Sequence, residues 1–147
     1  MNLSPDTGKY PRLDVVCAVI RDGDQYLACQ RSEIMREPLL WEFPGGKIEK
    51  GESLSLALHR EVLEELTAKV TIRGILRPSV SLQNQKLIYL HPLLCTWQDD
   101  GIFALKEHKS FQWVKPDRFF SLKWCPPDVD ILERLQDSQL ESTQWWR

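Results

Sequence analysis

Three glutamates in one short segment carry the chemistry that this sequence suggests most directly. Glu61, Glu64 and Glu65 follow one another at spacings of three and four residues. In an α-helix this spacing places side chains on one side, with Cβ atoms about 5–6 Å apart. Like charges at that distance destabilise an isolated helix by about 0.2–0.5 kcal/mol per pair. A hard divalent cation such as Mg²⁺, which prefers oxygen ligands, turns that repulsion into a binding site.

The alternative for these glutamates is a solvated acidic face, which is the usual place for charged side chains. Three features favour a metal site. The helix is apolar over much of its circumference, so the glutamates lie beside its buried stripe. Gly45–Gly46 precedes the helix and permits close backbone approach to a ligand, and Glu49 and Glu52 add carboxylates. Arg60, four residues before Glu64, can orient a carboxylate through a charge-assisted hydrogen bond.

The helix that must position these residues is predicted over residues 53–66. A leucine or valine recurs at every fourth position and forms one apolar stripe: Leu54, Leu58, Val62 and Leu66. Leu56 and Leu63 extend the apolar surface around the helix, which predicts that it is covered on more than one side. A second helix is predicted from Val129 to about Gln139, with Asp128 near its N-cap.

Strands are predicted on both sides of the first helix. The apolar run at residues 15–20 is typical of a strand buried on both faces, and a turn joins it to a second strand at residues 25–30, so a hairpin is expected. Residues 41–46 alternate in polarity, but Pro44 and the two glycines end any strand there. Further strands are predicted at residues 70–75, 87–97 and 111–114. His91-Pro92 interrupts the longest of them, which favours an edge position or a bulge.

Composition limits the class of protein. The chain has 147 residues, of which 42% are hydrophobic and 27% charged, and its formal net charge is −2. We expect a single domain over residues 1–147, with an irregular leader over residues 1–12. The order of strands, helix, strands and helix predicts a mixed α/β or α+β fold.

The same composition indicates which partners to expect. The near-neutral charge argues against binding to duplex nucleic acid. No apolar run reaches the roughly 18 residues that a membrane span needs, and no secretory signal is evident, so we expect a cytoplasmic protein. The four cysteines are scattered without metal-ligand spacing and are expected to be buried hydrophobic residues.

The glutamate segment resembles the Nudix box of the nucleoside diphosphate-linked hydrolases. It reads Gly46, five residues, Glu52, seven residues, and then Arg60-Glu61-Val62-Leu63-Glu64-Glu65. The run Trp-Glu-Phe-Pro-Gly-Gly-Lys-Ile-Glu at residues 41–49 is similar to the MutT branch of that family. The resemblance extends from about residue 15 to residue 135 and is strong only in the box. It implies an α/β/α sandwich with a mixed sheet, in which the box forms a loop-helix-loop at the catalytic edge.

Two positions depart from the family pattern. Thr67 and Ala68 stand where the box normally has a glycine and a bulky aliphatic residue. A glycine there would cap the helix with a positive φ angle, and a threonine in the same conformation would be strained by about 1 kcal/mol. We therefore expect the chain to leave the helix along a different path. Since every acidic ligand is present, the departures do not imply loss of activity.

The resemblance implies a role for each matching position around the metal. The metal-binding and water-activating carboxylates are Glu61, Glu64 and Glu65. The Gly45 carbonyl is a backbone ligand of Mg²⁺ or Mn²⁺, and three further residues support or orient the site: Gly46, Glu52 and Arg60. Glu107 matches an acid that some members supply from a loop, as a metal ligand or as the general base. The base is therefore either Glu61 or Glu107.

The resemblance also implies a substrate-binding set. Arg31 and Lys47 match positions that contact phosphates, although each alone is explained almost as well as a solvated surface cation. Glu42, in the MutT-like run, belongs to the same set. Asp128 falls where this branch places a base-reading Asn or Asp, and the alternative is a simple helix N-cap. A carboxylate accepts hydrogen bonds from base N–H groups, as both 8-oxo-guanine and cytosine offer.

The activity that the resemblance implies is the metal-dependent hydrolysis of (deoxy)nucleoside triphosphates to a monophosphate and pyrophosphate. Bound metal ions would neutralise the phosphates and hold the attacking water. The leading substrate is an oxidised nucleotide such as 8-oxo-dGTP, and the alternative is CTP or a modified dCTP. A non-catalytic Nudix-like domain that binds nucleotides or regulates a partner is the alternative from another class.

Three sets of residues are left without one assigned role. Trp41 and Phe43 either stack on the base or pack in the core. Trp145 and Trp146 are candidates for self-association, so the protein is expected to be a monomer or a homodimer. The three histidines are assigned no role.

Overall fold

A mixed sheet of eight strands forms the centre of the protein. The structure is a computed structural model that describes residues 8–98 and 103–137. Its strands are β1 (Arg12–Asp22), β2 (Gln25–Gln30), β3 (Trp41–Glu42), β4 (Gly45–Lys47), β5 (Val70–Ile75), β6 (Ser79–Gln83), β7 (Lys86–Trp97) and β8 (Ser110–Val114). The helices are α1 (Leu54–Leu66) and α2 (Val129–Gln136), the second preceded by the 3₁₀ helices η2 (Pro116–Ser121) and η3 (Pro126–Asp128). None of these helices is both long and apolar enough to cross a bilayer.

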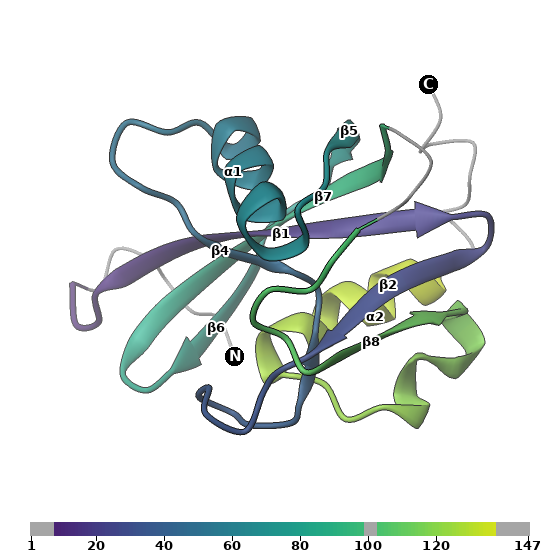
Figure 1. The fold of residues 1–147 in the computed structure, drawn as a ribbon. Coiled ribbons are helices and arrows are strands. Elements are labelled where there is room, and N and C mark those ends of the chain that lie inside the picture. Colours follow the sequence, from purple (N-terminus) through teal and green to yellow (C-terminus); the bar gives the residue numbers. More distant parts are fainter. Residues whose placement is uncertain (1–7, 99–102, 138–147) are drawn as a thin grey trace.

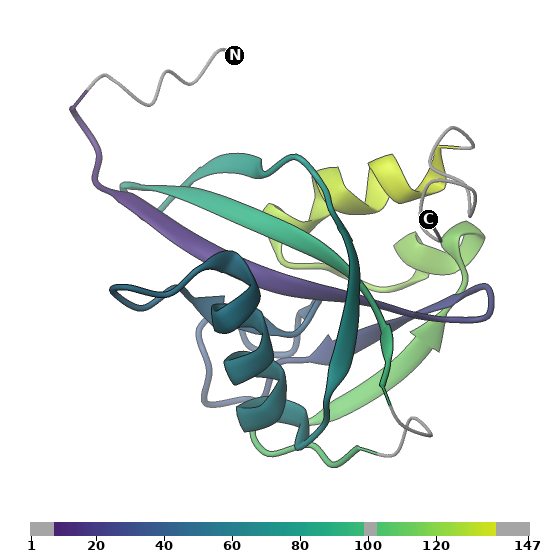
Figure 2. The same ribbon diagram turned by 90° about the horizontal axis from the view of Figure 1, so that it is seen from above.

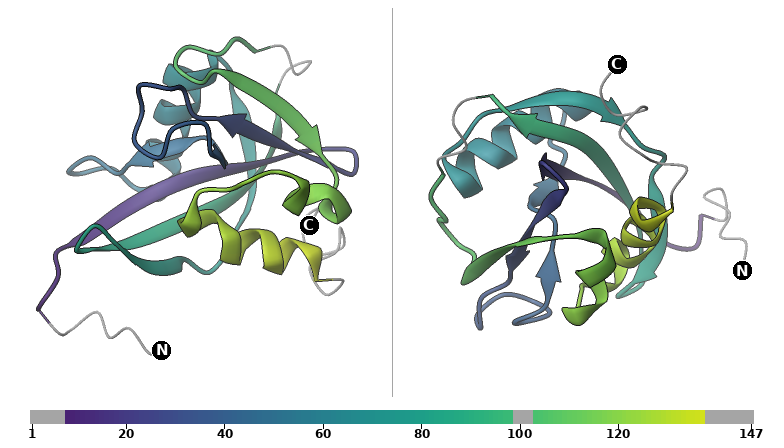
Figure 3. Two further views of the ribbon diagram at one scale, coloured as in Figure 1. Left: turned by 90° about the horizontal axis from the view of Figure 1, so that it is seen from below. Right: turned by 90° about the vertical axis from the view of Figure 1, so that its right-hand side faces the viewer.

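The long strand β1 organises the sheet. It runs parallel to β7 and antiparallel to β4 and to β2, with which it forms the predicted hairpin. The remaining strands pair with β2 or β7: β3 and β8 with the former, β5 and β6 with the latter. Helix α1 covers one face of this sheet and α2 the other (Figure 1), and Figures 2 and 3 show the two helices on opposite sides of β1. The predicted sandwich with a mixed sheet is confirmed.

Strand β1 is buried on both faces, as its apolar run predicts. Val16, Ala18 and Ile20 belong to the core cluster beneath α1. Cys17 and Val19 belong to the cluster beneath α2. Because successive side chains of a strand point to opposite faces, one continuous apolar run serves both layers of the core. The four cysteines are all buried and carry free thiols.

Helix α1 begins and ends where the sequence predicts. The Ser53 hydroxyl accepts a hydrogen bond from the backbone N–H of Leu56 at 3.1 Å and caps the first turn. The predicted stripe packs on the sheet, with its last three members fully buried: Leu58, Val62 and Leu66. Leu56 and Leu63, however, are 61% and 52% exposed. The expectation that the helix is covered on more than one side is therefore wrong, because the sheet touches only one of its faces.

The chain leaves α1 through a left-handed residue. Thr67 has φ 53° and ψ 43°, and its backbone N–H donates to the Leu63 carbonyl at 3.0 Å. The expectation of a different exit path is wrong, since the threonine adopts the conformation that a glycine usually takes in this position. Ala68 and Val70 follow it directly into the core beneath α1. Packing of these residues holds the strained threonine in place.

Strand β7 lies inside the sheet, so the predicted edge position is wrong. The Pro92 carbonyl accepts a hydrogen bond from Leu76 at 3.0 Å. Since the N–H and C=O of a strand residue point to the same side, the missing N–H of Pro92 faces the connection between β5 and β6, where no ladder needs it. Strand β6 was not predicted, although the alternation at residues 79–83 and the positive φ turn at Asn84–Gln85 make a regular hairpin with β7.

Two smaller differences concern element ends. Gly45 and Gly46 do not end strand structure but lie within β4. Helix α2 ends at Gln136 rather than near residue 139, because Asp137 is extended. Residues 1–7 of the predicted leader, together with Trp145 and Trp146, lie outside the described residues.

Replacing Thr67 by glycine should stabilise the protein. A left-handed conformation costs a residue with a Cβ atom about 1 kcal/mol or more, and glycine escapes this cost but gains entropy in the unfolded chain. We expect the Thr67→Gly variant to gain about 0.5–1 kcal/mol in the free energy of unfolding, measured by urea denaturation. The control Thr67→Ala keeps the Cβ atom and should show no such gain; equal stability of the two variants would contradict the strain.

Candidate active site

The three glutamates of α1 lie in different surroundings. The Glu61 side chain is 14% exposed and that of Glu65 is 11% exposed, whereas Glu64 is 58% exposed. The one-residue difference between Glu64 and Glu65 rotates the second carboxylate towards the sheet. The sequence therefore brings two of its three predicted ligands to the protein interior and leaves the third at the surface.

Arg60 connects the loop before α1 to the helix. Its guanidinium binds Glu52 in a bidentate manner, with Nε–Oε2 and Nη2–Oε1 distances of 2.6 and 2.8 Å. It also donates to Glu61 at 3.1 Å and to the Lys47 carbonyl at 3.0 Å. Arg60 and the Glu49 N–H lower the pKa of Glu52 to about 2. The predicted role of Arg60 in orienting carboxylates is thus reflected in its contacts.

Glu65 has the opposite electrostatic environment. Burial, followed by the negative charges of Glu42 and Glu61, raises the pKa of Glu65 to about 9, although the Gly45 N–H lowers it. Burial is also the main cause that raises the pKa of Glu61. Within the described residues, the Oε1 atom of Glu65 is buried and has no hydrogen-bond partner. A buried carboxylate without a compensating charge is costly.

The chemistry of these residues fits a divalent cation, although their side chains are not drawn together around one point. In the described part of the chain, no three acidic, histidine or cysteine side chains are gathered closely enough to hold an ion. Glu64 is turned towards Arg60, 3.4 Å away. The unpartnered oxygen of Glu65 and the raised pKa of both interior glutamates are what a cation would offset. Because the donors are oxygens, the set suits Mg²⁺ or Mn²⁺.

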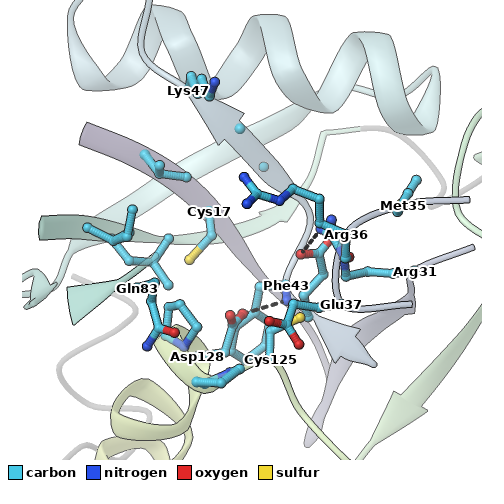
Figure 4. A pocket seen from close by; sticks show the side chains of 18 of the residues that line it. Cys17, Arg31, Met35, Arg36, Glu37, Phe43, Lys47, Gln83, Cys125 and Asp128 are labelled. Atoms are coloured by element: carbon cyan, nitrogen blue, oxygen red, sulfur yellow. Dashed lines mark hydrogen bonds and ion pairs between the residues drawn. The ribbon is translucent and has the colours of Figure 1, made fainter. Parts of the chain in front are cut away.

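A cavity of about 440 Å³ adjoins the glutamates. Its lining includes eight residues of the predicted site: Arg31, Glu42, Gly45, Gly46, Lys47, Glu65, Glu107 and Asp128. In Figure 4, Lys47 lies at one end of this cavity and Asp128 at the other. The other four predicted residues do not line it: Glu52, Arg60, Glu61 and Glu64. Glu61 lies against Gly46, where an added Cβ atom would come within 2.4 Å of its carboxylate.

Asp128 closes the far end of the cavity. Its Oδ2 atom accepts a hydrogen bond from the backbone N–H of Phe43 at 2.9 Å. The carboxyl is buried, and burial together with the charge of Glu42 holds its pKa well above the usual range. Within the described residues its side chain makes no capping hydrogen bond, although it stands at the N-cap position of α2. The interpretation of Asp128 as a simple N-cap is therefore wrong.

Contacts within the protein bear on two other predicted roles: that of Arg31 at the phosphates, and that of Trp41 and Phe43 at the base or in the core. Arg31 donates to Glu42 at 2.9 Å and to the backbone carbonyl of Arg36, so its guanidinium is held inside the protein. Phe43 and Trp41 are both core residues; Phe43 packs on Trp124 with a ring distance of 5.3 Å. Of the two, only Phe43 also lines the cavity.

Sequence reasoning missed two residues. Arg36 lines the cavity from the segment between β2 and β3, and Figure 4 shows its guanidinium turned into it. His108 is fully buried between Glu42 and Glu65. The segment around Arg36 is irregular, so no periodic pattern predicts which way its side chain points. For His108 the only signal is its position beside Glu107.

The raised pKa of Glu65 predicts how stability depends on pH without metal. The folded protein holds this proton with a pKa of about 9, against an ordinary value of 4.5. The stabilisation is complete below the ordinary value and is lost as pH rises towards 9. In EDTA, we expect the free energy of unfolding of the wild type to fall between pH 5 and pH 9 relative to that of Glu65→Gln.

The exposed neighbour provides the control for this measurement. Glu64→Gln, on the same helix, should follow the pH dependence of the wild type. Parallel curves for the wild type and Glu65→Gln would contradict a buried, uncompensated Glu65. Urea denaturation at a series of pH values gives the required free energies.

Known proteins resemble this chain in sequence and in structure. The sequence matches the NUDIX domain over residues 11–145. A CTP pyrophosphohydrolase of Escherichia coli (strain K12) is 31% identical over 124 residues, which cover 82% of this chain and 89% of the relative. An 8-oxo-dGTP diphosphatase of Buchnera aphidicola subsp. Schizaphis graminum (strain Sg) is 30% identical over 97 residues, which cover 66% of this chain and 72% of the relative.

Solved structures also resemble this chain. The crystal structure of the MutT protein from Methanosarcina mazei Go1 superposes with a TM-score of 0.79 at 25% sequence identity, and the match covers 90% of this chain and 99% of that one. Both comparisons agree with the glutamate motif and with the sandwich that positions it. The chain therefore belongs to the Nudix family and is a MutT-like Nudix hydrolase.

Proposed function

We propose that this Nudix nucleoside triphosphate pyrophosphohydrolase acts on oxidised nucleotides, with 8-oxo-dGTP as the leading substrate. The observation that carries the proposal is one cavity that is lined by Glu65 and Glu107 as well as by Phe43 and Asp128. Lys47 and Asp128 lie at its opposite ends in Figure 4. Its volume of about 440 Å³ is within the usual range for small-molecule sites. The triphosphate would lie near Lys47 and the acidic residues together with metal, and the base would lie at the end that Asp128 closes.

The metal, Mg²⁺ or Mn²⁺, would be held by a set of oxygen donors: Glu61, Glu64, Glu65, Glu107 and the Gly45 carbonyl. When bound, it would neutralise phosphate charge and lower the pKa of a water molecule. Arg60 would keep Glu61 oriented through its 3.1 Å hydrogen bond. Of the two candidates for the general base, Glu107 lines the cavity and Glu61 does not, which favours Glu107.

The phosphate contacts would come from the cations at the cavity wall. Lys47 is exposed there, and Arg36 turns into the cavity in Figure 4. Arg31 is committed to Glu42 and to the Arg36 carbonyl. We therefore assign Arg31 to holding the wall of the cavity and assign the phosphate contact to Arg36 and Lys47.

Asp128 would read the base. Burial raises its pKa well above the usual range and so favours the protonated carboxyl, which both donates and accepts hydrogen bonds. An 8-oxopurine presents an N–H beside a carbonyl oxygen, which such a group matches. Cytosine presents an amino group beside a ring nitrogen, and this chain is 31% identical to a CTP pyrophosphohydrolase. CTP or a modified dCTP is therefore the second candidate.

A nucleotide panel distinguishes the two candidates. With Mg²⁺, we expect kcat/KM for 8-oxo-dGTP to exceed that for dGTP, dCTP and CTP by at least about tenfold, scored by pyrophosphate release. Asp128→Ala should reduce this preference by about 10–100-fold, since one matched polar contact is worth about 1–3 kcal/mol. A preference for CTP or dCTP would overturn 8-oxo-dGTP as the leading substrate and support the second candidate.

The contact between Gly46 and Glu61 predicts a large effect of one methyl group. The Cβ atom of Gly46→Ala would lie 2.4 Å from the Glu61 carboxylate and displace it. A misplacement of about 1 Å can cost about 100-fold, so we expect kcat to fall by about this factor with the fold retained. The control is Gly74→Ala, whose Cβ would meet Leu94 at an ordinary 3.5 Å. Equal activity of the two variants would contradict the role of Glu61.

A further inference from the structure

His108 is buried next to Glu42 and Glu65, two residues that line the cavity. Its side chain is 0% exposed, and its backbone segment is held on both sides: Lys106 donates to the Glu65 carbonyl at 3.0 Å and Lys109 to the Gln30 carbonyl at 2.9 Å. The backbone on both sides of His108 is therefore tied to α1 and β2.

The ring of His108 bridges two carboxylates. Its Nε2 atom lies 2.8 Å from Oε2 of Glu42, and its Nδ1 atom lies 3.6 Å from Oε2 of Glu65. The first contact is a full hydrogen bond and the second is longer than one. Within the described ranges, neither Nδ1 of His108 nor Oε1 of Glu65 has a hydrogen-bond partner, although both atoms are buried.

Glu42 extends this bridge to the base side of the cavity. Its second oxygen, Oε1, accepts from Nη1 of Arg31 at 2.9 Å, and Arg31 donates in turn to the Arg36 carbonyl. Arg36, which is assigned to the phosphates, is followed by Glu37, and both residues line the cavity. In Figure 4, Glu37 lies next to Asp128, at the end assigned to the base. One chain of contacts thus joins Glu65 to the segment that walls the nucleotide.

A histidine that only filled the core would be expected to satisfy both ring nitrogens, because buried polar atoms normally have partners. Here one nitrogen is satisfied and the other faces a carboxylate of the expected metal site. Both partners of the ring, Glu42 and Glu65, line the cavity. Without the ring the two carboxylates would face each other directly, and their repulsion would turn Glu65 away.

We propose that His108 is a positioning residue that orients Glu65 for metal through Nδ1 and orients the base-side wall through Nε2, Glu42 and Arg31. This inference rests on the proposed function, since it assigns Glu65 to the metal and the Arg36 segment to the nucleotide. His108 would then support metal affinity through Nδ1 and nucleotide discrimination through Nε2.

The two arms can be separated by substitution. His108→Gln places an amide near the position of Nε2 and removes the group that faces Glu65. We expect it to weaken Mn²⁺ binding, measured by electron paramagnetic resonance without nucleotide, by about 10–100-fold, while the ratio of kcat/KM values between 8-oxo-dGTP and CTP stays within about threefold. His108→Asn places an amide near Nδ1 but is too short to reach Glu42. It should keep Mn²⁺ affinity within about threefold and change that ratio by about tenfold or more.

His91 provides a matched control. It is also a histidine on a carboxylate, with Nε2 2.8 Å from Asp14 and a side chain that is 14% exposed, but neither residue lines the cavity. His91→Gln and His91→Asn should lower Tm by amounts similar to the His108 variants and leave Mn²⁺ affinity and nucleotide discrimination unchanged.

The outcomes separate this inference from the proposed function. If both His108 variants bind Mn²⁺ and discriminate nucleotides like the wild type, or change both quantities in the same way, the two-armed role is wrong. If the wild type hydrolyses none of the nucleotides but His108→Gln alone loses Mn²⁺ affinity, the proposed function fails while the metal arm stands.

Discussion

The close approach of one backbone segment to its neighbours on two sides is the constraint on which the site depends. A Cβ atom on Gly45 would lie 1.9 Å from the Val16 carbonyl oxygen, and one on Gly46 would lie 2.4 Å from the Glu61 carboxylate. Strand β4 therefore fills the space between β1 and α1 with backbone alone. The register of β4 on β1, which pairs Gly46 with Val16, then sets how far α1 stands from the sheet and where its glutamates meet the cavity.

Within that frame the acidic residues divide into two groups. Arg60 compensates the charge of Glu52 and lowers its pKa to about 2, so this carboxylate ties the loop to the helix. Burial raises the pKa of Glu65 to about 9, so folding leaves this carboxylate uncompensated. Two glutamates in one loop-helix unit thus receive opposite pKa shifts. The nearly neutral sum of charges in the sequence conceals this local excess, which a metal ion and its polyanionic ligand would offset.

Patterns that repeat along the chain were predictable, and contacts between distant segments were not. The i+4 stripe of α1 and the two-faced run of β1 follow from local periodicity, and both are in the structure. The exposure of Leu56 was missed because a sequence does not tell which face a sheet will cover. Thr67 was misjudged because intrinsic strain was weighed without the packing of Ala68 and Val70 that outweighs it. His108 had no partner in the sequence near it.

The buried series of polar contacts from Arg31 through Glu42 to His108 is the part of the site that the sequence predicts least well. Its members are separated by up to 77 residues and come from three segments, so no local pattern links them. Desolvating these charges costs free energy, and apolar residues would pack the same space at a lower cost. Apolar residues could not orient the Glu65 carboxylate. The orientation that the polar contacts give this carboxylate would offset the cost. The polar chain, placed between the metal side and the base side, is therefore better explained by positioning than by stability.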